Sequence, residues 1–497
     1  MREIIKAIFK TGSCSIISII LTVISSKVLA IVLGSNGVGL YSLIKQTLDT
    51  ATTAGVMGGQ TALVQGLASK QGAEKDRYLT TVFWIFVCGA MVIALCFLLF
   101  SPLISQTIFA SKDEKTISLV RWMALPAVLA IMSTYLGSLL NGFRAIGRLA
   151  IGQVIVSIVT VFLMYPISKL VSSGYIIAFI LMISASTMGG IIFCLTVAQK
   201  EKWLNPLIVN FKPKIDKGDV KHFYQIAITT LISGLIGVGV MLIIRTMITR
   251  YGGFSSVGIF SVAWALSMTY VMLVVGSFGT YYLPTLSGIN DIPSRNKLIQ
   301  DLFRISLLLI IPIIITVIVL KPLLITVLYT HEFMPSLKII RWMLVGDYFK
   351  VCSWVFAMPM LAYKDMNVFF WTELSWNMGL LILSYIGIIY YNDIQLIGTA
   401  FLILYVFYFV YSIFYAHNKH SVVLTKNSLV HWILGLLLII AASCQTWEDT
   451  QVNWISALIW IAVAFGFSWM TLNKGERRKT LHLLRLENEY SAGQHSE

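Results

Sequence analysis

The sequence predicts an all-α polytopic membrane protein with about fourteen transmembrane helices, and three observations support this fold class. Of the 497 residues, 57% are apolar and only 12% are charged, whereas soluble domains carry about 25% charged residues. Long apolar runs recur from residue 11 to residue 472, and one bilayer crossing takes roughly 20 residues. An internal repeat divides these runs into two sets of six and a final pair. The chain therefore has short connections and no room for a soluble catalytic domain.

Hydropathy and turn signals predict the position of each span. The expected spans are residues 11–33, 40–67, 79–100, 117–139, 149–169, 174–198, 223–248, 256–284, 305–329, 337–361, 368–391, 396–416, 428–444 and 453–472.

Basic residues predict the orientation of the chain. With residue 1 in the cytoplasm, the inside segments contain 25 Lys and Arg residues, and the outside loops contain 4. Cytoplasmic loops are enriched in Lys and Arg, so both termini are expected in the cytoplasm. This topology explains most of the net charge of +15, and no nucleic-acid partner is expected.

Two matched stretches indicate an internal repeat. Val38-Gly39-Leu40-Tyr41-Ser42 matches Val257-Gly258-Ile259-Phe260-Ser261, and Arg121-Trp122-Met123 matches Arg341-Trp342-Met343 at almost the same offset. At that second offset, Arg144 corresponds to Lys364. Because six spans intervene, the copies have the same orientation, and such parallel repeats are typical of transporters.

The repeat predicts the domain organisation. We expect an N-lobe at 1–199, a basic cytoplasmic linker at 200–222, a C-lobe at 223–420, two additional spans at 421–473 and a cytoplasmic tail at 474–497.

Charged residues inside the expected spans are mostly basic. The eight bases are Lys27, Lys45, Arg121, Arg245, Lys321, Lys338, Arg341 and Lys350, and the three acids are Asp49, Asp347 and Glu373. A buried charge at mid-span costs about 2.5–3.5 kcal/mol, so this excess should face water, partners or an anionic ligand. Most of the bases fall in the outer half of the bilayer, and Lys350 is the deepest. Guanidinium and ammonium groups converge well on phosphate oxygens, so the pattern favours a diphosphate in a cationic cavity between the lobes.

Candidate substrate-binding residues are Lys27, Arg121, Arg245, Arg341 and Lys350, with Lys45, Asp49, Asp347 and Glu373 as charge partners or proton-exchanging groups. A structural alternative remains, because Lys45 with Asp49 and Asp347 with Lys350 could be self-neutralising pairs. Arg121, Lys338 and Arg341 could also extend to the membrane interface. The six cysteines are isolated and no phosphate-binding loop occurs, so no catalytic residues, cofactor or metal are expected.

Several stretches carry a resemblance to a known family. They are Gly37–Ser42, Asn141-Gly142-Phe143-Arg144, Tyr282–Ser287, Leu344-Val345-Gly346-Asp347-Tyr348-Phe349-Lys350-Val351 and Thr372-Glu373-Leu374-Ser375. Over roughly residues 5–420 the chain resembles the Wzx-type lipid-linked oligosaccharide flippases of the MOP exporter superfamily, particularly the O-antigen translocase and enterobacterial-common-antigen flippase branch.

The resemblance implies two six-helix lobes of MOP/MATE-like fold in the bacterial inner membrane. The expected cargo is an undecaprenyl-diphosphate-linked oligosaccharide of lipopolysaccharide or related polysaccharide biosynthesis, moved by alternating access. Expected partners are membrane lipids and the polymerase and chain-length components of the glycan assembly pathway.

Three alternatives stay open. Peptidoglycan-precursor flippases of the same superfamily also have fourteen spans. A polytopic O-antigen polymerase or glycosyltransferase would need a longer outside loop, and a cation antiporter of the same broad fold would need a net acidic cavity.

Overall fold

The computed structural model describes residues 2–206, 217–277, 282–289, 291–448 and 450–472. Its elements are helices, and no strand occurs in these ranges, which confirms the predicted all-α fold class. The expected tail at 474–497 and residues 207–216 of the expected linker lie outside the described residues.

The first compact unit contains the described residues up to Ser261, together with Thr326–Phe333 and Glu373–Ile394. Its helices are α1 (Arg2–Val56), α2 (Gly59–Ser69), α3 (Gly72–Leu99), α4 (Ser101–Ile108), α5 (Glu114–Trp122), α6 (Ala124–Gly142), α7 (Ile146–Ser172), α8 (Ala178–Lys200), most of α10 (Lys217–Ser277), most of α14 (Met366–Tyr385) and the π-helix η3 (Ile386–Tyr390).

The second compact unit contains Val262–Ile325, Met334–Thr372 and the described residues from Gln395 onward. Its helices are the end of α10, α11 (Leu283–Ser287), most of α12 (Ile292–Leu328), α13 (Leu337–Ala362), α15 (Leu396–His420), α16 (Lys426–Gln445) and α17 (Trp454–Thr471), and the 3-10 helix η2 (His331–Ser336) crosses the division between the units. The bounds of both units differ from those of the two expected lobes, which stay a prediction.

Eleven described helices are long and apolar enough to cross a membrane. Two of these, Cys14–Val56 and Thr230–Val271, are each long enough for two crossings. Helix α13 also has the length of a span, but charged residues such as Asp347 and Lys350 lower its hydropathy. All fourteen expected segments are thus largely helical, and the number of membrane crossings stays a prediction.

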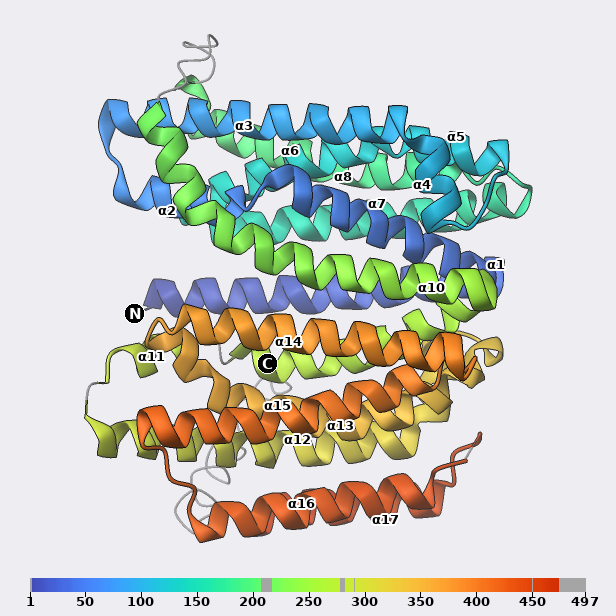
Figure 1. Ribbon diagram of the computed structural model, residues 1–497, viewed down its shortest axis with the longest axis vertical. Coiled ribbons are helices and arrows are strands. Elements are labelled where there is room, and N and C mark those ends of the chain that lie inside the picture. Colours follow the sequence, from blue (N-terminus) through green and yellow to red (C-terminus); the bar gives the residue numbers. More distant parts are fainter. Residues whose placement is uncertain (1, 207–216, 278–281, 290, 449, 473–497) are drawn as a thin grey trace, which may run out of the picture. The chain divides into compact units, whose positions relative to one another are not determined.

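A single glycine breaks each of the two longest helices. Gly34 in α1 has φ 60° and ψ −161°, and Gly253 in α10 has φ 72° and ψ −179°. Glycine adopts such a backbone at low cost because it lacks a Cβ atom. Figure 1 shows that α1 changes direction along its length. The two glycines are equivalent in the internal repeat, so the same break occurs once in each copy.

The turns after α6 and α13 are also equivalent. Arg144 has φ 59° and Lys364 has φ 60°, both in the left-handed region. The next residue's N–H donates five residues back in each turn, from Ala145 to Leu140 at 2.8 Å and from Asp365 to Met360 at 2.7 Å. This is the pattern that commonly ends an α-helix. The repeat inferred from sequence therefore extends to backbone conformation.

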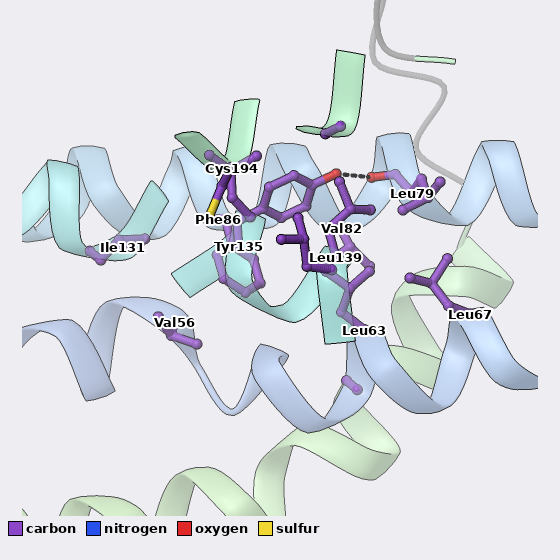
Figure 2. Close-up of a cluster of buried hydrophobic side chains, with 14 of the residues drawn as sticks. Val56, Leu63, Leu67, Leu79, Val82, Phe86, Ile131, Tyr135, Leu139 and Cys194 are labelled. Carbon is purple, nitrogen blue, oxygen red and sulfur yellow. Dashed lines mark hydrogen bonds between the residues drawn. The ribbon is translucent and has the colours of Figure 1, made fainter. Parts of the chain in front are cut away.

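A buried apolar cluster holds the N-terminal helices of the first unit together. Val56, Leu63, Phe86, Tyr135 and Cys194 bring α1, α2, α3, α6 and α8 into one core (Figure 2). Helices α1 and α3 approach so closely that a Cβ atom on Gly89 would overlap the backbone of Gly55. This core fixes the position of the second part of α1, which contains the candidate residues Lys45 and Asp49.

Candidate functional site

Equivalent residues of the two repeat copies contact each other within the first unit. The hydroxyl groups of Ser42 and Ser261 lie 2.8 Å apart. A Cβ atom on Gly39 would overlap the carbonyl of Phe254, and one on Gly258 would overlap the carbonyl of Ser35. Such reciprocal contacts are those of two equivalent segments around a two-fold axis. Residues just after the two glycine breaks therefore form a symmetric helix crossing.

Lys27 binds backbone carbonyl groups near the same end of the unit. Its ammonium donates to the carbonyl of Thr326 at 2.6 Å and to that of Tyr329. These carbonyls lie at the C-terminal end of α12, where a helix leaves acceptors without helical partners. The structure thus places this predicted substrate-binding residue at a helix end, where it joins segments from both copies of the repeat.

Glu332 adds a second connection at the break in α1. Its carboxylate accepts hydrogen bonds from the Ser35 N–H at 3.0 Å and from the Ser35 hydroxyl. The same hydroxyl lies 2.6 Å from that of Ser255. A carboxylate at the start of a helix also interacts favourably with the helix dipole. Sequence reasoning missed Glu332, because it assigned this residue to a loop and considered only charges inside the spans.

Arg245 lies beside the second part of α1. One terminal nitrogen donates to the Ser42 carbonyl at 2.9 Å, and its Nε is buried without a hydrogen-bond partner among the described residues. Asp49 is within electrostatic range of both Arg245 and Lys45. Lys45 and Asp49 are exposed one helical turn apart. The structure therefore brings these three predicted residues together, and the arginine keeps an unused donor.

Arg121 stands apart from this group. It is about half exposed, and its guanidinium lies 3.7 Å from the Glu114 carboxylate. Its Nε donates to the Ser101 hydroxyl at 3.2 Å. These contacts join α4 to α5, so the described contacts of this candidate are local.

Asp347 and Lys350 are buried in the second unit. Both carboxylate oxygens of Asp347 accept from the Ser267 hydroxyl, at 2.9 and 2.8 Å, and one also accepts from Tyr270. The ammonium of Lys350 lies 3.0 Å from the Met268 sulfur and 5.7 and 5.6 Å from the ring centres of Phe401 and Tyr405. Asp347 and Lys350 also interact electrostatically. The acid thus has hydroxyl partners, and the lysine lies among aromatic rings.

Two further basic residues, Lys321 and Arg341, contact the connection between α16 and α17. The fully buried Lys321 donates to the carbonyl of Thr446 at 2.5 Å and to its hydroxyl at 3.3 Å. The Arg341 guanidinium lies 4.2 Å from a ring centre of Trp447, a distance typical of cation–π contacts. The Nε of Arg341 is buried without a hydrogen-bond partner among the described residues. The connection between the two additional helices therefore contacts Arg341, a predicted substrate-binding residue, and Lys321, another of the eight intramembrane bases.

Glu373 and Lys338 complete the set of intramembrane charges. Glu373 is half-buried in α14, and its backbone carbonyl accepts from Asn377 at 2.8 Å. Lys338 is exposed at the start of α13. No group of three or more His, Cys, Asp or Glu side chains that could hold a metal ion occurs in the described part of the chain. A single chamber shared by the charges of both repeat copies stays a prediction.

Comparison with known proteins gives a family match and a curated relative. The profile of a family described as "Polysaccharide biosynthesis protein" matches residues 4–290. A curated relative, the Lipid III flippase of Escherichia coli (strain K12), is 24% identical over 377 residues, which cover 74% of this chain and 88% of the relative.

Two solved structures share the fold. The Lipid II flippase MurJ in an inward closed conformation has a TM-score of 0.69 at 18% identity and covers 94% of this chain and 98% of its own. An inward-facing multidrug resistance MATE family transporter of the MOP superfamily has a TM-score of 0.62 at 12% identity, covering 86% of this chain and 96% of its own.

Proposed function

The chain belongs to the polysaccharide biosynthesis protein family, and on this premise we propose that it is a flippase of the Wzx type. Its cargo is an undecaprenyl-diphosphate-linked oligosaccharide, an O-antigen or related repeat unit, which it moves from the cytoplasmic to the periplasmic leaflet of the inner membrane. The 24% identity to a Lipid III flippase supports this class of activity. The protein is a transporter in this proposal, with no catalytic residues.

The physical task is to keep a polar head solvated across the membrane. The hydrocarbon core is about 30 Å thick, and burying hydroxyl and phosphate groups there without hydrogen bonds costs several kcal/mol for each group. A water-filled path lined by cations lowers this cost for a diphosphate, while the polyprenyl tail remains in lipid.

The observation that carries the proposal is the Nε of Arg245, which is buried without a hydrogen-bond partner among the described residues. A buried guanidinium N–H without a partner is costly, and a phosphate oxygen is a favourable acceptor for it. Exposed Lys45 supplies a second cation nearby, and Asp49 lies within range of both. We assign Arg245 and Lys45 to the diphosphate and Asp49 to holding them between transport cycles.

Contacts near Gly34 support a state that is closed on the periplasmic side. With the N-terminus in the cytoplasm, Gly34 ends the first outward span. Lys27 and Glu332 join segments from both repeat copies there. In the proposed cycle these contacts break when the outer end opens and re-form after the cargo has left.

A complementation experiment tests the proposed function. A strain lacking the gene should accumulate lipid-linked oligosaccharide in the cytoplasmic leaflet, and wild-type protein should restore periplasmic delivery. Arg245→Ala should lower delivery at least tenfold at equal protein levels, because it removes the donor. Arg148→Ala is the matched control, since that arginine pairs with Glu201 at 2.6 Å on the surface.

The same strain separates the alternatives. Accumulation of peptidoglycan precursor, with O-antigen delivery unchanged, would favour the peptidoglycan flippase. Unpolymerised repeat units that have already reached the periplasmic side would favour the polymerase. Complementation by Arg245→Ala at the wild-type level would count against the role of this arginine.

A further inference from the structure

A pocket of about 470 Å³ lies in the first unit between the start of α3 and the turns that follow α6 and α8. Its lining includes Lys75, Asp76, Phe143, Lys202, Trp203 and Asn205. None of these residues takes part in the contacts of Arg245 or of Lys27. The pocket is therefore separate from the charges assigned to transport.

Two aromatic rings and a lysine form one wall of this pocket. Phe143 and Trp203 stack with ring centres 4.4 Å apart and an interplanar angle of 3°. The ammonium of Lys75 lies 4.1 Å from the ring centre of Phe143. This wall combines an apolar surface with a fixed positive charge. Lys202, whose side chain is exposed, supplies a second positive charge.

The second repeat copy contains the same arrangement. Arg295 lies 5.3 Å from the ring centre of Tyr363, and Tyr363 stacks on His420 with ring centres 4.8 Å apart. Tyr363 follows α13 as Phe143 follows α6, and Arg295 lies in the first turn of α12 as Lys75 lies in the first turn of α3. A cation above a stacked pair of rings is thus a feature of both copies.

The two copies differ in the position of a carboxylate. In the second copy, Asp365 accepts from Lys419 at 2.7 Å and from Tyr415, and it lies 3.5 Å from His420. This carboxylate neutralises the basic groups around it. The equivalent residue in the first copy is Ala145, which has no charge. The first copy instead has a carboxylate at Asp76, which is equivalent to Asn296, and the two lysines Lys75 and Lys202 outnumber this one acid in the pocket lining.

We propose that the first-copy pocket binds a phosphate ester that carries hydroxyl groups, either as a lipid headgroup or as a free glycerol or sugar phosphate. Lys75 and Lys202 attract the phosphate, and the stacked rings contact the carbon face of the polyol. The Asp76 carboxylate and the Asn205 amide are suited to hydroxyl groups rather than to a second phosphate. Basic pockets at the cytoplasmic end of membrane helices commonly bind anionic headgroups.

Native mass spectrometry of the full chain in detergent tests this proposal. The probes are dioctanoyl phosphatidylglycerol, which has both a phosphate and hydroxyl groups, and dioctanoyl phosphatidylcholine, which lacks hydroxyl groups and net charge. We expect saturable binding that favours phosphatidylglycerol by at least tenfold. Competition by free glycerol 3-phosphate would show that the head alone is sufficient. Failure to compete, with phosphatidylglycerol still bound, would identify the lipid as the source.

Two variants distinguish a built site from general attraction of anions. Lys202→Asn should weaken phosphatidylglycerol binding about fivefold, and it suits the backbone because Asn tolerates the positive φ of 58° at this position. Asp76→Asn should also weaken binding, because a neutral amide oxygen accepts hydrogen bonds from hydroxyl groups less strongly than a carboxylate does. Simple charge attraction predicts the opposite, since this change removes a negative charge. Lys115→Asn, at an exposed lysine in the first turn of α5, is the control.

Equal binding of the two lipids would overturn the proposal. So would tighter phosphatidylglycerol binding by Asp76→Asn, or a Lys202→Asn variant that binds like Lys115→Asn. Size-exclusion profiles and helical circular dichroism of each variant confirm that the fold is retained.

Discussion

The hydroxyl groups of Ser42 and Ser261 lie 2.8 Å apart, and the two residues occupy the same position in the two copies of the internal repeat. The sequence match between residues 38–42 and 257–261 is thus also a contact in space. Equivalent residues touch only where they lie near the pseudo-two-fold axis. The crossing at Gly39 and Gly258 leaves no room for a side chain, and in the proposed transport cycle these two segments separate when the periplasmic end opens.

A disulfide at this crossing should stop transport. In a background without the six native cysteines, we expect Ser42→Cys with Ser261→Cys to form a cross-link under oxidation. Delivery of the lipid-linked glycan should fall at least tenfold and recover after reduction, because the link prevents separation of the helices. Each single cysteine variant is the control. Transport that continues with the link fully formed would show that this crossing does not open.

Removal of the Glu332 charge should loosen the contacts at the break in α1. Glu332→Gln weakens a charge-assisted hydrogen bond to the Ser35 N–H, and a carboxylate at a helix start contributes about 0.3–1 kcal/mol. We expect a cysteine placed at Ser255 to react several times faster with a membrane-impermeant thiol reagent. Glu114→Gln is the control, because Glu114 is exposed and pairs only loosely with Arg121. An unchanged reaction rate of this cysteine would show that Glu332 does not hold the two segments together.

Asp219 should make the stability of the first unit depend on pH in the acid range. Burial raises the pKa of this carboxyl, but the hydrogen bonds and charges of Lys70 at 2.7 Å and Arg77 at 2.9 Å outweigh burial and hold the pKa below its ordinary value. A lowered pKa gives stability that is complete above the unfolded value, about 3.9. That stability is lost as the pH falls through the folded value.

The thermal midpoint should therefore decline below about pH 4 in the wild type. Asp219→Asn should lower the midpoint at pH 7, with a cost of roughly 1–3 kcal/mol, and should flatten the acid decline. Asp113→Asn, at an exposed residue of the same unit whose side chain makes no capping hydrogen bond to α5, is the control. An acid decline of the same size in Asp219→Asn would assign the effect to other groups.

The connection between α16 and α17 should stabilise the second unit through Trp447. Trp447→Ala removes the cation–π contact with Arg341 and the edge-on contact with Trp342, whose ring centre is 4.8 Å away. We expect a loss of about 1–2 kcal/mol, measured as a lower thermal midpoint. Trp454→Ala, at a residue that is 59% exposed, should change it little. Equal shifts in the two variants would show that the contact with Arg341 is not stabilising.

Helices and the repeat were predictable from the sequence because both leave local or periodic signals. Apolar runs placed the helical segments, and the match of Arg144 with Lys364 anticipated two turns of the same conformation. The hydrogen-bond partners of the charged residues were harder to predict from the sequence. Lys27 and Lys321 bind backbone carbonyls, and every residue has a carbonyl, so composition and spacing do not distinguish the acceptor.

Contacts between charged residues could be predicted only where the two residues are close in the sequence. Lys45 and Asp49 lie one turn apart on one helix, which periodicity can detect. Arg245 lies near them but comes from a helix nearly 200 residues away, and no local spacing connects it to this pair. Glu332 lies outside the expected spans, so a search for intramembrane charges did not include it.

Transport by purified protein in liposomes tests the central claim most directly. The measurement is the rate at which a labelled polyprenyl-diphosphate-linked oligosaccharide in the inner leaflet becomes accessible from outside. We predict that wild-type protein raises this rate well above that of protein-free liposomes, that Arg148→Ala retains it, and that Arg245→Ala lowers it at least tenfold. A wild-type rate equal to that of protein-free liposomes would contradict the account.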